Sequence, residues 1–360
     1  DGSRIVFAMR APHIEDADDD EQPSWNIWEY QVLTKTLRRI INSNTIAEDG
    51  DDIAPAYLPD GRIVFSSSRQ RRSKAILLDE GKPQFEALDE SRNAPALVLH
   101  VMEDDGENIK QITYNQSSDL DPTVLDNGQI LFTRWDNYSN RGAMDLYRVN
   151  PDGTGLEYMY GKHSHATGSN DSDIQFLKPL TLPDGQILIR PRGYQSNRYG
   201  SDIMAIDINN FTDNTQPTQA NSGAVNTAQQ SLSFGDVRTD TALSPGGLIN
   251  SAYPVRDGTG RLLLSWSQCR LIEKPLAEAT TPPSTTIFPC TPERLSDERY
   301  TSAPPLYGLW IFDPLSQTQL PIVAPEESFM YTDAVVIKAR TLPNIIGEAD
   351  HSSTAATQLV

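Results

Sequence analysis

One turn-and-strand pattern occurs five times along the chain, and it constrains the fold more than any other feature. A tight turn ending in glycine precedes an apolar run in DGSRIVFAMR from Asp1, LPDGRIVFSSSR from Leu58, LDNGQILFTRW from Leu125, LPDGQILIRPR from Leu182 and RDGTGRLLLSW from Arg256. Glycine tolerates a positive φ, so each copy predicts a hairpin turn followed by a buried strand. Five copies indicate a repeat protein.

A second hairpin follows the first in every repeat. Its copies are Ile27–Ile41, Leu97–Thr113, Leu146–Tyr160, Ile203–Asn210 and Leu309–Val323. Each repeat therefore predicts one four-stranded antiparallel sheet. Unbroken apolar runs such as Ile130-Leu131-Phe132 require cover on both faces of the sheet, which neighbouring copies provide. The predicted fold is an all-β β-propeller, because two separate β-sandwiches would not explain the repeated pattern.

The two ends of the sequence bear on the number of blades. Asp1-Gly2 is already a hairpin turn without a preceding inner strand, and Tyr331–Lys338 has the pattern of an inner strand without a following hairpin. We predict that Tyr331–Lys338 pairs antiparallel with Ile5–Ala8 and closes a five-bladed ring. The alternative is a segment of a longer protein with six blades. Residues 1–340 form the predicted propeller, and residues 341–360 a linker or tail.

Composition excludes several classes of partner. The formal charge of −19, with no basic stripe to offset it, argues against nucleic acid. No apolar run is long enough to span a bilayer. Cys269 and Cys290 lie in one Pro/Thr-rich insertion, and we favour a disulfide between them over two free thiols or metal ligation. A disulfide implies an oxidising compartment, periplasmic or extracellular.

The repeats resemble those of TolB-type propellers, in which a Pro-Asp-Gly turn precedes an apolar strand and a hairpin like LYRVNPDGTG follows. More narrowly, GDDIAPAYLPDGRIVFSSSR, DLDPTVLDNGQILFTRW and MDLYRVNPDGTGLEYMYG resemble the propeller domain of proteins related to the hydrazine synthase alpha subunit. That resemblance implies the fold, an exported setting and a place in a larger assembly. The family's chemistry rests on haem bound through CxxCH motifs, which this chain lacks, so no catalytic residue carries over.

Long insertions fall between the second and third strands of each repeat. They are Ala11–Ser24, Gln70–Pro95, Asp136–Ala143, Gly193–Ser201 and Ser267–Pro305, whereas the opposite ends of the sheets carry short Pro-Asp-Gly turns. Elaborated loops on a rigid scaffold are where binding usually resides. We call the insertion-bearing ends of the sheets the insertion side.

Acidic residues mark the starts of the inner strands on the insertion side. They are Asp51, Asp52, Asp119, Asp121, Asp171, Asp173 and Asp333. A ring of carboxylates at the channel mouth suits a divalent cation or a basic group of a partner. The alternative, which we favour, is that each aspartate accepts local backbone N–H groups where its strand begins.

Arginine and aromatic residues follow the second strands. They are Arg10, Arg69, Arg134, Trp135, Arg190, Arg192, Tyr194 and Trp266. Such residues are typical interface anchors, and the aromatic ones also suit stacking on a sugar ring. The competing interpretation is that the arginines pair with the neighbouring aspartates and hold the blades in register.

Catalytic motifs are missing from the sequence, which contains no CxxCH, GxSxG, P-loop or HExxH. The metal-ligand pattern is weak and consists of Asp52, Asp121, Asp173, His163 and His165. We therefore expect no cofactor, apart from the channel-mouth cation considered above. The leading hypothesis is a non-catalytic exported propeller that presents its insertion side to a protein partner. The alternatives are a propeller that binds a carbohydrate or another small ligand, and a metal-dependent enzyme with its site at the channel mouth.

Overall fold

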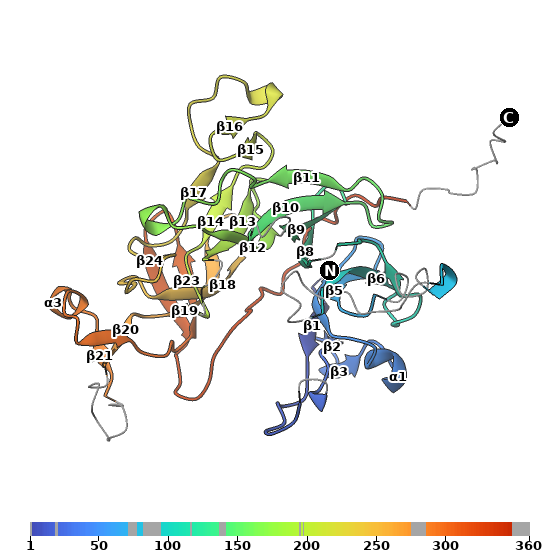
Figure 1. Cartoon of the computed structure of the whole chain (residues 1–360), viewed down its shortest axis with the longest axis horizontal. Helices are drawn as coiled ribbons and strands as arrows, with labels where there is room; N and C mark the ends of the chain where they lie inside the picture. The colour runs from blue at the N-terminus through green and yellow to red at the C-terminus, as the bar shows by residue number, and fades with distance from the viewer. Residues whose placement is uncertain are drawn as a thin grey trace. The chain divides into compact units, whose positions relative to one another are not determined.

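The computed structural model describes residues 2–18, 21–70, 78–81, 95–115, 117–136, 142–193, 196, 198–274 and 286–347 (Figure 1). The chain divides into two compact units. One holds residues 1–140, 146–158 and 339–360, and the other holds residues 141–145 and 159–338. Each unit is built from antiparallel sheets that correspond to the sequence repeats, and we refer to these sheets as blades.

Three blades belong wholly or mainly to the first unit. Blade 1 contains β1 (Arg4–Met9), β2 (Asn26–Gln31) and β3 (Thr36–Arg39). Blade 2 contains β4 (Asp52–Tyr57), β5 (Ile63–Ser67), β6 (Val98–Met102) and β7 (Lys110–Gln111). Blade 3 contains β8 (Asp119–Val124), β9 (Ile130–Asp136), β10 (Ala143–Val149) and β11 (Glu157–Tyr160).

Two blades belong to the second unit. Blade 4 contains β12 (Gln175–Thr181), β13 (Ile187–Arg192), β14 (Met204–Ile206) and β17 (Gln229–Ser231), with the hairpin β15 (Phe211–Asp213) and β16 (Gln216–Pro217) inserted before its outer strand. Blade 5 contains β18 (Leu248–Pro254), β19 (Leu262–Ser267), β23 (Gly308–Asp313) and β24 (Thr318–Val323).

Helices are few and short. The described residues include the single turns α1 (Asn44–Ala47) and α3 (Pro292–Leu295), and the 3-10 turns η3 (Ser169–Asp171) and η4 (Gln219–Asn221). The all-β fold with four-stranded antiparallel blades is therefore confirmed. No described helix has the length and apolar character needed to cross a bilayer.

Apolar side chains on the blades interlock with those of the next blade in sequence. Val64 and Leu99 of blade 2 pack with Ile130 and Phe132 of blade 3. In the second unit, Leu188 of blade 4 packs in one cluster with blade 5 residues, among them Leu264, Trp266 and Phe312. This packing explains the unbroken apolar runs of the second strands, which are covered on both faces.

The inner strands of blades 2, 3 and 4 share a bulge at a residue that precedes proline. Ala54, Asp121 and Lys178 have φ near +50° and precede Pro55, Pro122 and Pro179. The pairing of each inner strand with its second strand shifts register at this point. The bulge bends the inner strand and increases its twist.

The hairpin turns adopt the predicted conformation. Gly61 has φ +98° and Gly128 has φ +89°, values that favour glycine. At Gly128 a side chain is also excluded by packing, because an added Cβ would lie 2.2 Å from the carbonyl oxygen of Asn344. The amide of Asn344 in turn donates a hydrogen bond to Asp126. Residues near Asn344 therefore pack on the β8–β9 turn.

The predicted pairing of Tyr331–Lys338 with Ile5–Ala8 would join residues of the two units, and it stays a prediction. Within the described residues, β1 pairs only with β2, and residues 331–338 form no strand. Side-chain contacts hold the segment instead. The Tyr331 carbonyl accepts a hydrogen bond from Ser265, and Asp333 forms an ion pair with Lys178.

The insertions leave the blades between the second and third strands, as predicted. Gln70–Pro95 and Asp136–Ala143 lie mostly outside the described residues. In blade 5 the insertion forms its own sheet of β20 (Arg270–Glu273), β21 (Phe288–Pro289) and β22 (Tyr300–Ser302). The predicted disulfide is confirmed, since Cys269 and Cys290 are bonded across β20 and β21.

We expect the disulfide to stabilise this small sheet specifically. Replacing Cys269 and Cys290 by serine should lower the local free energy of opening by about 3 kcal/mol, because the insertion buries few apolar groups of its own. Hydrogen exchange at Leu271–Glu273 should accelerate, whereas exchange in β19 should not change. Equal acceleration in β19 would contradict the prediction.

Candidate functional site

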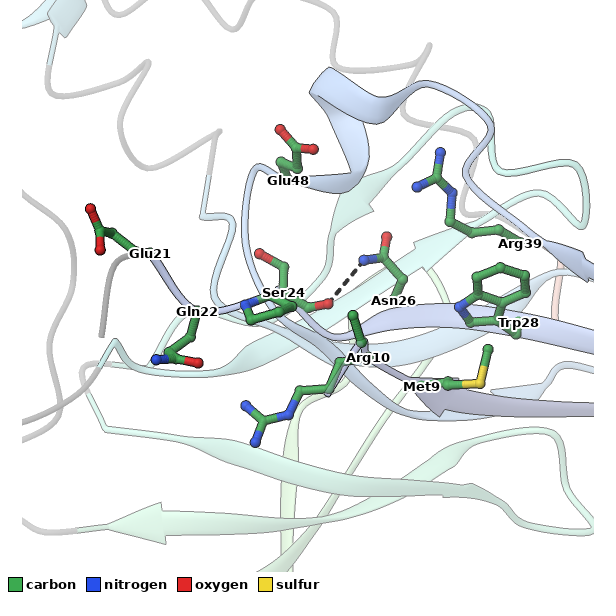
Figure 2. Close-up of a pocket in the computed structure, with 11 residues that line it drawn as sticks. Met9, Arg10, Glu21, Gln22, Ser24, Asn26, Trp28, Arg39 and Glu48 are labelled. Carbon is green, nitrogen blue, oxygen red and sulfur yellow. Dashed lines mark hydrogen bonds between the residues drawn. The ribbon is translucent and has the colours of Figure 1, made fainter. Parts of the chain in front are cut away.

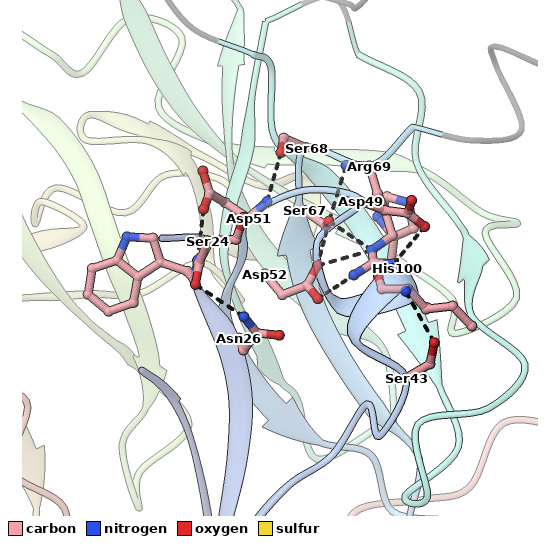
Figure 3. A network of polar contacts seen from close by, with 12 residues as sticks. Ser24, Asn26, Ser43, Asp49, Asp51, Asp52, Ser67, Ser68, Arg69 and His100 are labelled. Atoms are coloured by element: carbon pink, nitrogen blue, oxygen red, sulfur yellow. Dashed lines mark hydrogen bonds and ion pairs between the residues drawn. The ribbon is translucent and has the colours of Figure 1, made fainter. Parts of the chain in front are cut away.

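Arg69 is buried within the fold. Its guanidinium contacts both carboxylate oxygens of Asp52, with Nη2 to Oδ2 at 2.5 Å and Nε to Oδ1 at 3.1 Å (Figure 3). Ser67 donates to the same carboxylate at 2.6 Å. Asp52 and Arg69 are at most 1% exposed. The pair joins the first residue of β4 to a residue just after β5. This contact agrees with the interpretation that these arginines hold the blades in register.

Arg134 is held in a similar way with looser geometry. Its Nε lies 3.7 Å from Oδ1 of Asp119, and its guanidinium stacks on the ring of Tyr147 at 5.5 Å. Asn115 also donates to the Asp119 carboxylate. Burial raises the pKa of Asp119 against the lowering effect of Arg134. In blades 2 and 3, the aspartate at the start of the inner strand therefore pairs with an arginine that lies just after the second strand in blade 2 and near its end in blade 3.

The tryptophans predicted to bind a partner or a sugar are packed in the protein. Trp135 and Trp266 are each 8% exposed. Trp266 donates its indole N–H to the Gly246 carbonyl and makes edge contacts with Phe234 and Trp310. Tyr194, the third aromatic candidate, lies outside the described residues. The two described rings therefore offer no open stacking surface.

Arg190 and Arg192 lie on one face of β13, next to blade 5. Arg190 donates to the carbonyl of Asn250 in β18 at 2.7 Å, and Arg192 donates to the carbonyl of Ser196. Burial and the nearby charge of Arg190 lower the pKa of Arg192. Both guanidiniums bind backbone carbonyls, so their role toward a partner stays a prediction.

The candidate metal ligands are dispersed. No group of three or more His, Cys, Asp or Glu side chains able to hold a metal ion occurs in the part of the chain that the structure describes. His165 contacts the Asp145 carboxylate and the Ile174 carbonyl through its two ring nitrogens. The backbone N–H of His163 donates to Asp213. Asp121 occupies the bulge of β8, and Asp173 forms a β-bridge with Ala166.

An open cleft lies on the insertion side of blade 1 (Figure 2). It has a volume of about 720 Å³, within the usual range for ligand sites. Its lining combines part of the Ala11–Ser24 insertion with strand residues and the end of α1: Met9, Arg10, Ala11, Glu21, Gln22, Pro23, Ser24, Asn26, Trp28, Arg39 and Glu48. Arg10 was predicted from the sequence, whereas Met9, Asn26, Trp28 and Arg39 were not.

The missed residues share one face of blade 1. Met9 lies opposite Asn26, and Trp28 lies opposite Arg39. The other face carries Val6 and Ile27, which pack toward blade 2. The alternation in NIWEYQ contained this information, because Ile27 and Glu29 are buried while Asn26 and Trp28 are half-buried.

The cleft wall is anchored to the buried Asp52–Arg69 pair. The carboxylate of Asp51 accepts the backbone N–H of Trp25 at 2.8 Å, and the amide of Asp52 donates to the Trp25 carbonyl at 2.9 Å. Figure 3 shows Ser24, Asn26 and Asp51 beside Asp52 and Arg69. The start of β2, with Asn26 in the cleft, is thus fixed by the start of β4.

The polar groups that line the cleft can form further contacts with a ligand. Arg10 stacks on the Trp25 ring at 5.0 Å, and Arg39 donates to Asn42 and Asn44. Neither arginine forms an ion pair with a described carboxylate. Asn26 donates to the Ser24 carbonyl, while its own buried Oδ1 has no hydrogen-bond partner among the described residues. An unpaired acceptor of this kind favours a donor from a ligand or water.

We expect the Asp52–Arg69 pair to be costly to break. Arg69→Met leaves the Asp52 carboxylate buried without its partner, which should lower the free energy of unfolding by about 3 to 5 kcal/mol. The double variant Asp52→Leu, Arg69→Met should recover part of this loss in denaturant titrations. A single-variant loss below about 1 kcal/mol would show that the pair is not desolvated as described.

His100 should make the fold sensitive to acid. Burial lowers its pKa to about 4, and the nearby charge of Arg69 acts in the same direction. Between pH 6.5 and 4 the unfolded chain therefore binds a proton that the folded chain does not, so the free energy of unfolding falls as pH falls, by about 3 kcal/mol. His100→Gln should flatten this dependence in unfolding titrations, whereas substitution of the exposed His13 should not.

Comparisons with known proteins support the fold. No family model and no curated protein matches the sequence. Hydrazine synthase from Kuenenia stuttgartiensis is structurally similar, with a TM-score of 0.56 and 17% identity over 91% of this chain and 38% of that one. A putative TolB from Agrobacterium tumefaciens gives a TM-score of 0.35, with 13% identity over 56% of this chain and 57% of that one.

An oligogalacturonate lyase from Vibrio parahaemolyticus gives a TM-score of 0.40 and 11% identity, over 83% of this chain and 60% of that one. At 17% identity, the likeness to hydrazine synthase supports the β-propeller-type fold and says nothing about activity. The present chain spans well under half of the hydrazine synthase chain that it matches.

Proposed function

We propose that this protein is a non-catalytic, exported β-propeller module that binds a protein partner on its insertion side. The observation that carries the proposal is the blade 1 cleft, which part of the Ala11–Ser24 insertion builds and whose two arginines have no described carboxylate partner. Ordering an insertion costs conformational entropy. Binding of a partner in the cleft would explain why the insertion is ordered despite this cost.

Charge supports an acidic segment of the partner as the ligand. The chain has a formal charge of −19, yet Arg10 and Arg39 in the cleft form no ion pair with a described carboxylate. Arg4 and Arg38, on the same blade as the cleft, both pair with Glu29. Arg10 and Arg39 instead contact an aromatic ring and neutral oxygens. Arginines placed in this way favour a partner's carboxylates.

The cleft also supplies apolar contact. Met9 and Trp28 line it beside the two arginines, as Figure 2 shows. Tryptophan and arginine are enriched among residues that dominate binding energy at protein interfaces, and methionine adapts its shape to irregular partners. An acidic segment with one apolar or aromatic side chain therefore fits the composition of the cleft.

The disulfide supports an exported setting. Cys269 and Cys290 are bonded, and no free cysteine occurs in the described chain. Disulfides persist in oxidising compartments and are rare in the cytosol. The partner would therefore be a periplasmic or extracellular protein.

Site-specific crosslinking in native extract tests the proposal. A photoreactive residue at Gln22, in the cleft lining, should yield one dominant crosslinked protein, and the same group at Asp60, in a Pro-Asp-Gly turn, should not. The double variant Arg10→Glu, Arg39→Glu should reduce the product by at least about tenfold, since one interface arginine contributes roughly 2 kcal/mol.

A matched variant controls for net charge. Arg62→Glu with Arg148→Glu reverses the same number of charges outside the cleft and should leave the crosslink unchanged. An equal loss of the crosslinked product in both double variants would show that crosslinking depends on the net charge of the protein and not on the arginines of the cleft. A product that forms equally from Asp60 would place the partner away from the insertion side.

A further inference from the structure

An arginine in blade 4 stands where three other blades carry a hydroxyl side chain. The fifth residue after the hairpin glycine is Arg190 in blade 4, but in blades 2, 3 and 5 it is Ser66, Thr133 and Ser265. Ser66 donates its hydroxyl to the carbonyl of Asp119, in the inner strand of the next blade, at 2.9 Å. A hydroxyl is therefore sufficient for this link between consecutive blades.

Arg190 makes the corresponding link and retains a further donor. Its Nη1 donates to the carbonyl of Asn250, in the inner strand of blade 5, at 2.7 Å. Its Nε is buried and has no hydrogen-bond partner in the described structure. Nε belongs to the edge of the guanidinium that Arg69 uses to bind the carboxylate of Asp52. The link between the blades thus leaves Arg190 with an unpaired donor on an edge that binds anions.

Two further buried donors lie close to this guanidinium. The side chain of Tyr307 is 0% exposed and that of Ser201 3%, and neither hydroxyl has a hydrogen-bond partner among the described residues. Gly200 packs against the Tyr307 hydroxyl, because an added Cβ would clash with its oxygen. Burial raises the pKa of Tyr307, while the nearby charge of Arg190 lowers it. Buried polar groups are normally paired, so these unpaired donors indicate a missing acceptor.

The surroundings of Arg190 are basic. Residues 185–201 contain three arginines and no aspartate or glutamate, although the whole chain has 49 acidic residues. Burial and the nearby charge of Arg190 lower the pKa of Arg192. Both arginines donate to backbone carbonyls, and neither forms an ion pair with a described carboxylate. An anion between them would relieve the repulsion of their like charges.

The number of positive charges indicates an anion with two negative charges. In its other blades the protein balances one carboxylate with one arginine, as in the pairs of Asp52 with Arg69 and of Asp119 with Arg134. In blade 4, two guanidiniums and two hydroxyls lie together without a described carboxylate. A phosphate group carries a charge of about −2 and several strong acceptor oxygens, which match this set of donors.

We infer that the insertion side of blade 4 binds a phosphate or sulfate group between Arg190 and Arg192, with the hydroxyls of Tyr307 and Ser201 as further donors. The ligand is a tetrahedral dianion, either free or as an ester. Arg192 is half-buried and Tyr199 is 68% exposed, so this side of the site is open to solvent. The site shares no residue with the cleft of blade 1, and the two proposals can fail independently.

Titration of the full chain with inorganic phosphate tests the inference. In chloride buffer of low ionic strength, calorimetry should show one site with a dissociation constant below about 1 mM. Sulfate should compete with phosphate, whereas acetate, which has a single charge, should bind at least about tenfold more weakly. Methyl phosphate separates the two sources of the group. If it binds like phosphate, an ester fits the site, and if it is excluded, the ligand is the free anion; either result supports the site.

Variants of the full chain locate the site. Arg190→Ser restores the hydroxyl that other blades carry, so the fold should persist while phosphate binding weakens at least about tenfold. Arg192→Gln should have a similar effect. Arg261→Gln removes the same charge from a hairpin turn of blade 5, where Arg261 pairs with Asp257, and it should bind phosphate as the wild type does.

Tyr307→Phe distinguishes a ligand-binding hydroxyl from a structural one. The substitution removes only the hydroxyl, which has no described partner in the free chain. The Tm without phosphate should therefore not fall, whereas the rise in Tm that saturating phosphate causes should become smaller.

Four outcomes would overturn the inference. Absence of phosphate binding at about 10 mM would exclude a useful site. Acetate that binds as tightly as phosphate would exclude a site for a dianion. An equal loss of binding in Arg261→Gln would show that only the net charge matters. A lower Tm of Tyr307→Phe without phosphate would show that the hydroxyl already has a structural partner.

Discussion

Blades 2 to 5 of this protein depend on cover for both faces of their sheets. A second strand such as β5 is buried along its whole length, and burial of each large apolar side chain contributes about 1.5 to 3 kcal/mol. No single four-stranded sheet can supply that cover for itself. Packing between consecutive blades, together with the hydroxyl of Ser66 on the carbonyl of Asp119, meets this requirement.

The same requirement explains what the sequence could predict. Five glycine turns and apolar runs such as Ile130-Leu131-Phe132 report local conformation and burial on both faces, so the blades and their four-stranded order follow directly. The pairing of Tyr331–Lys338 stays a prediction. Its pattern is that of an inner strand, but pairing also needs a second strand at the right distance, which no local pattern reports.

The candidate site was harder to predict because position after a strand does not distinguish exposed from buried arginines. Arg69 and Arg10 both follow second strands, yet Arg69 is buried against Asp52 while Arg10 is exposed beside the cleft. The difference arises from the neighbours. Blade 2 places an aspartate opposite its arginine, whereas blade 1 has no described inner strand to provide one. Trp266 was predicted to bind a partner because tryptophan is common at interfaces, but it packs in the hydrophobic core between blades 4 and 5.

The proposed binding cleft occurs where a repeat is incomplete in the described structure. Blade 1 has a second, third and fourth strand without an inner strand, and one face of it supplies Met9, Asn26, Trp28 and Arg39 to the cleft. In complete blades the equivalent groups are covered by the next strand or blade. An incomplete repeat therefore exposes side chains that a neighbouring strand or blade covers elsewhere in the fold. A partner can bind these side chains through the same kinds of contact.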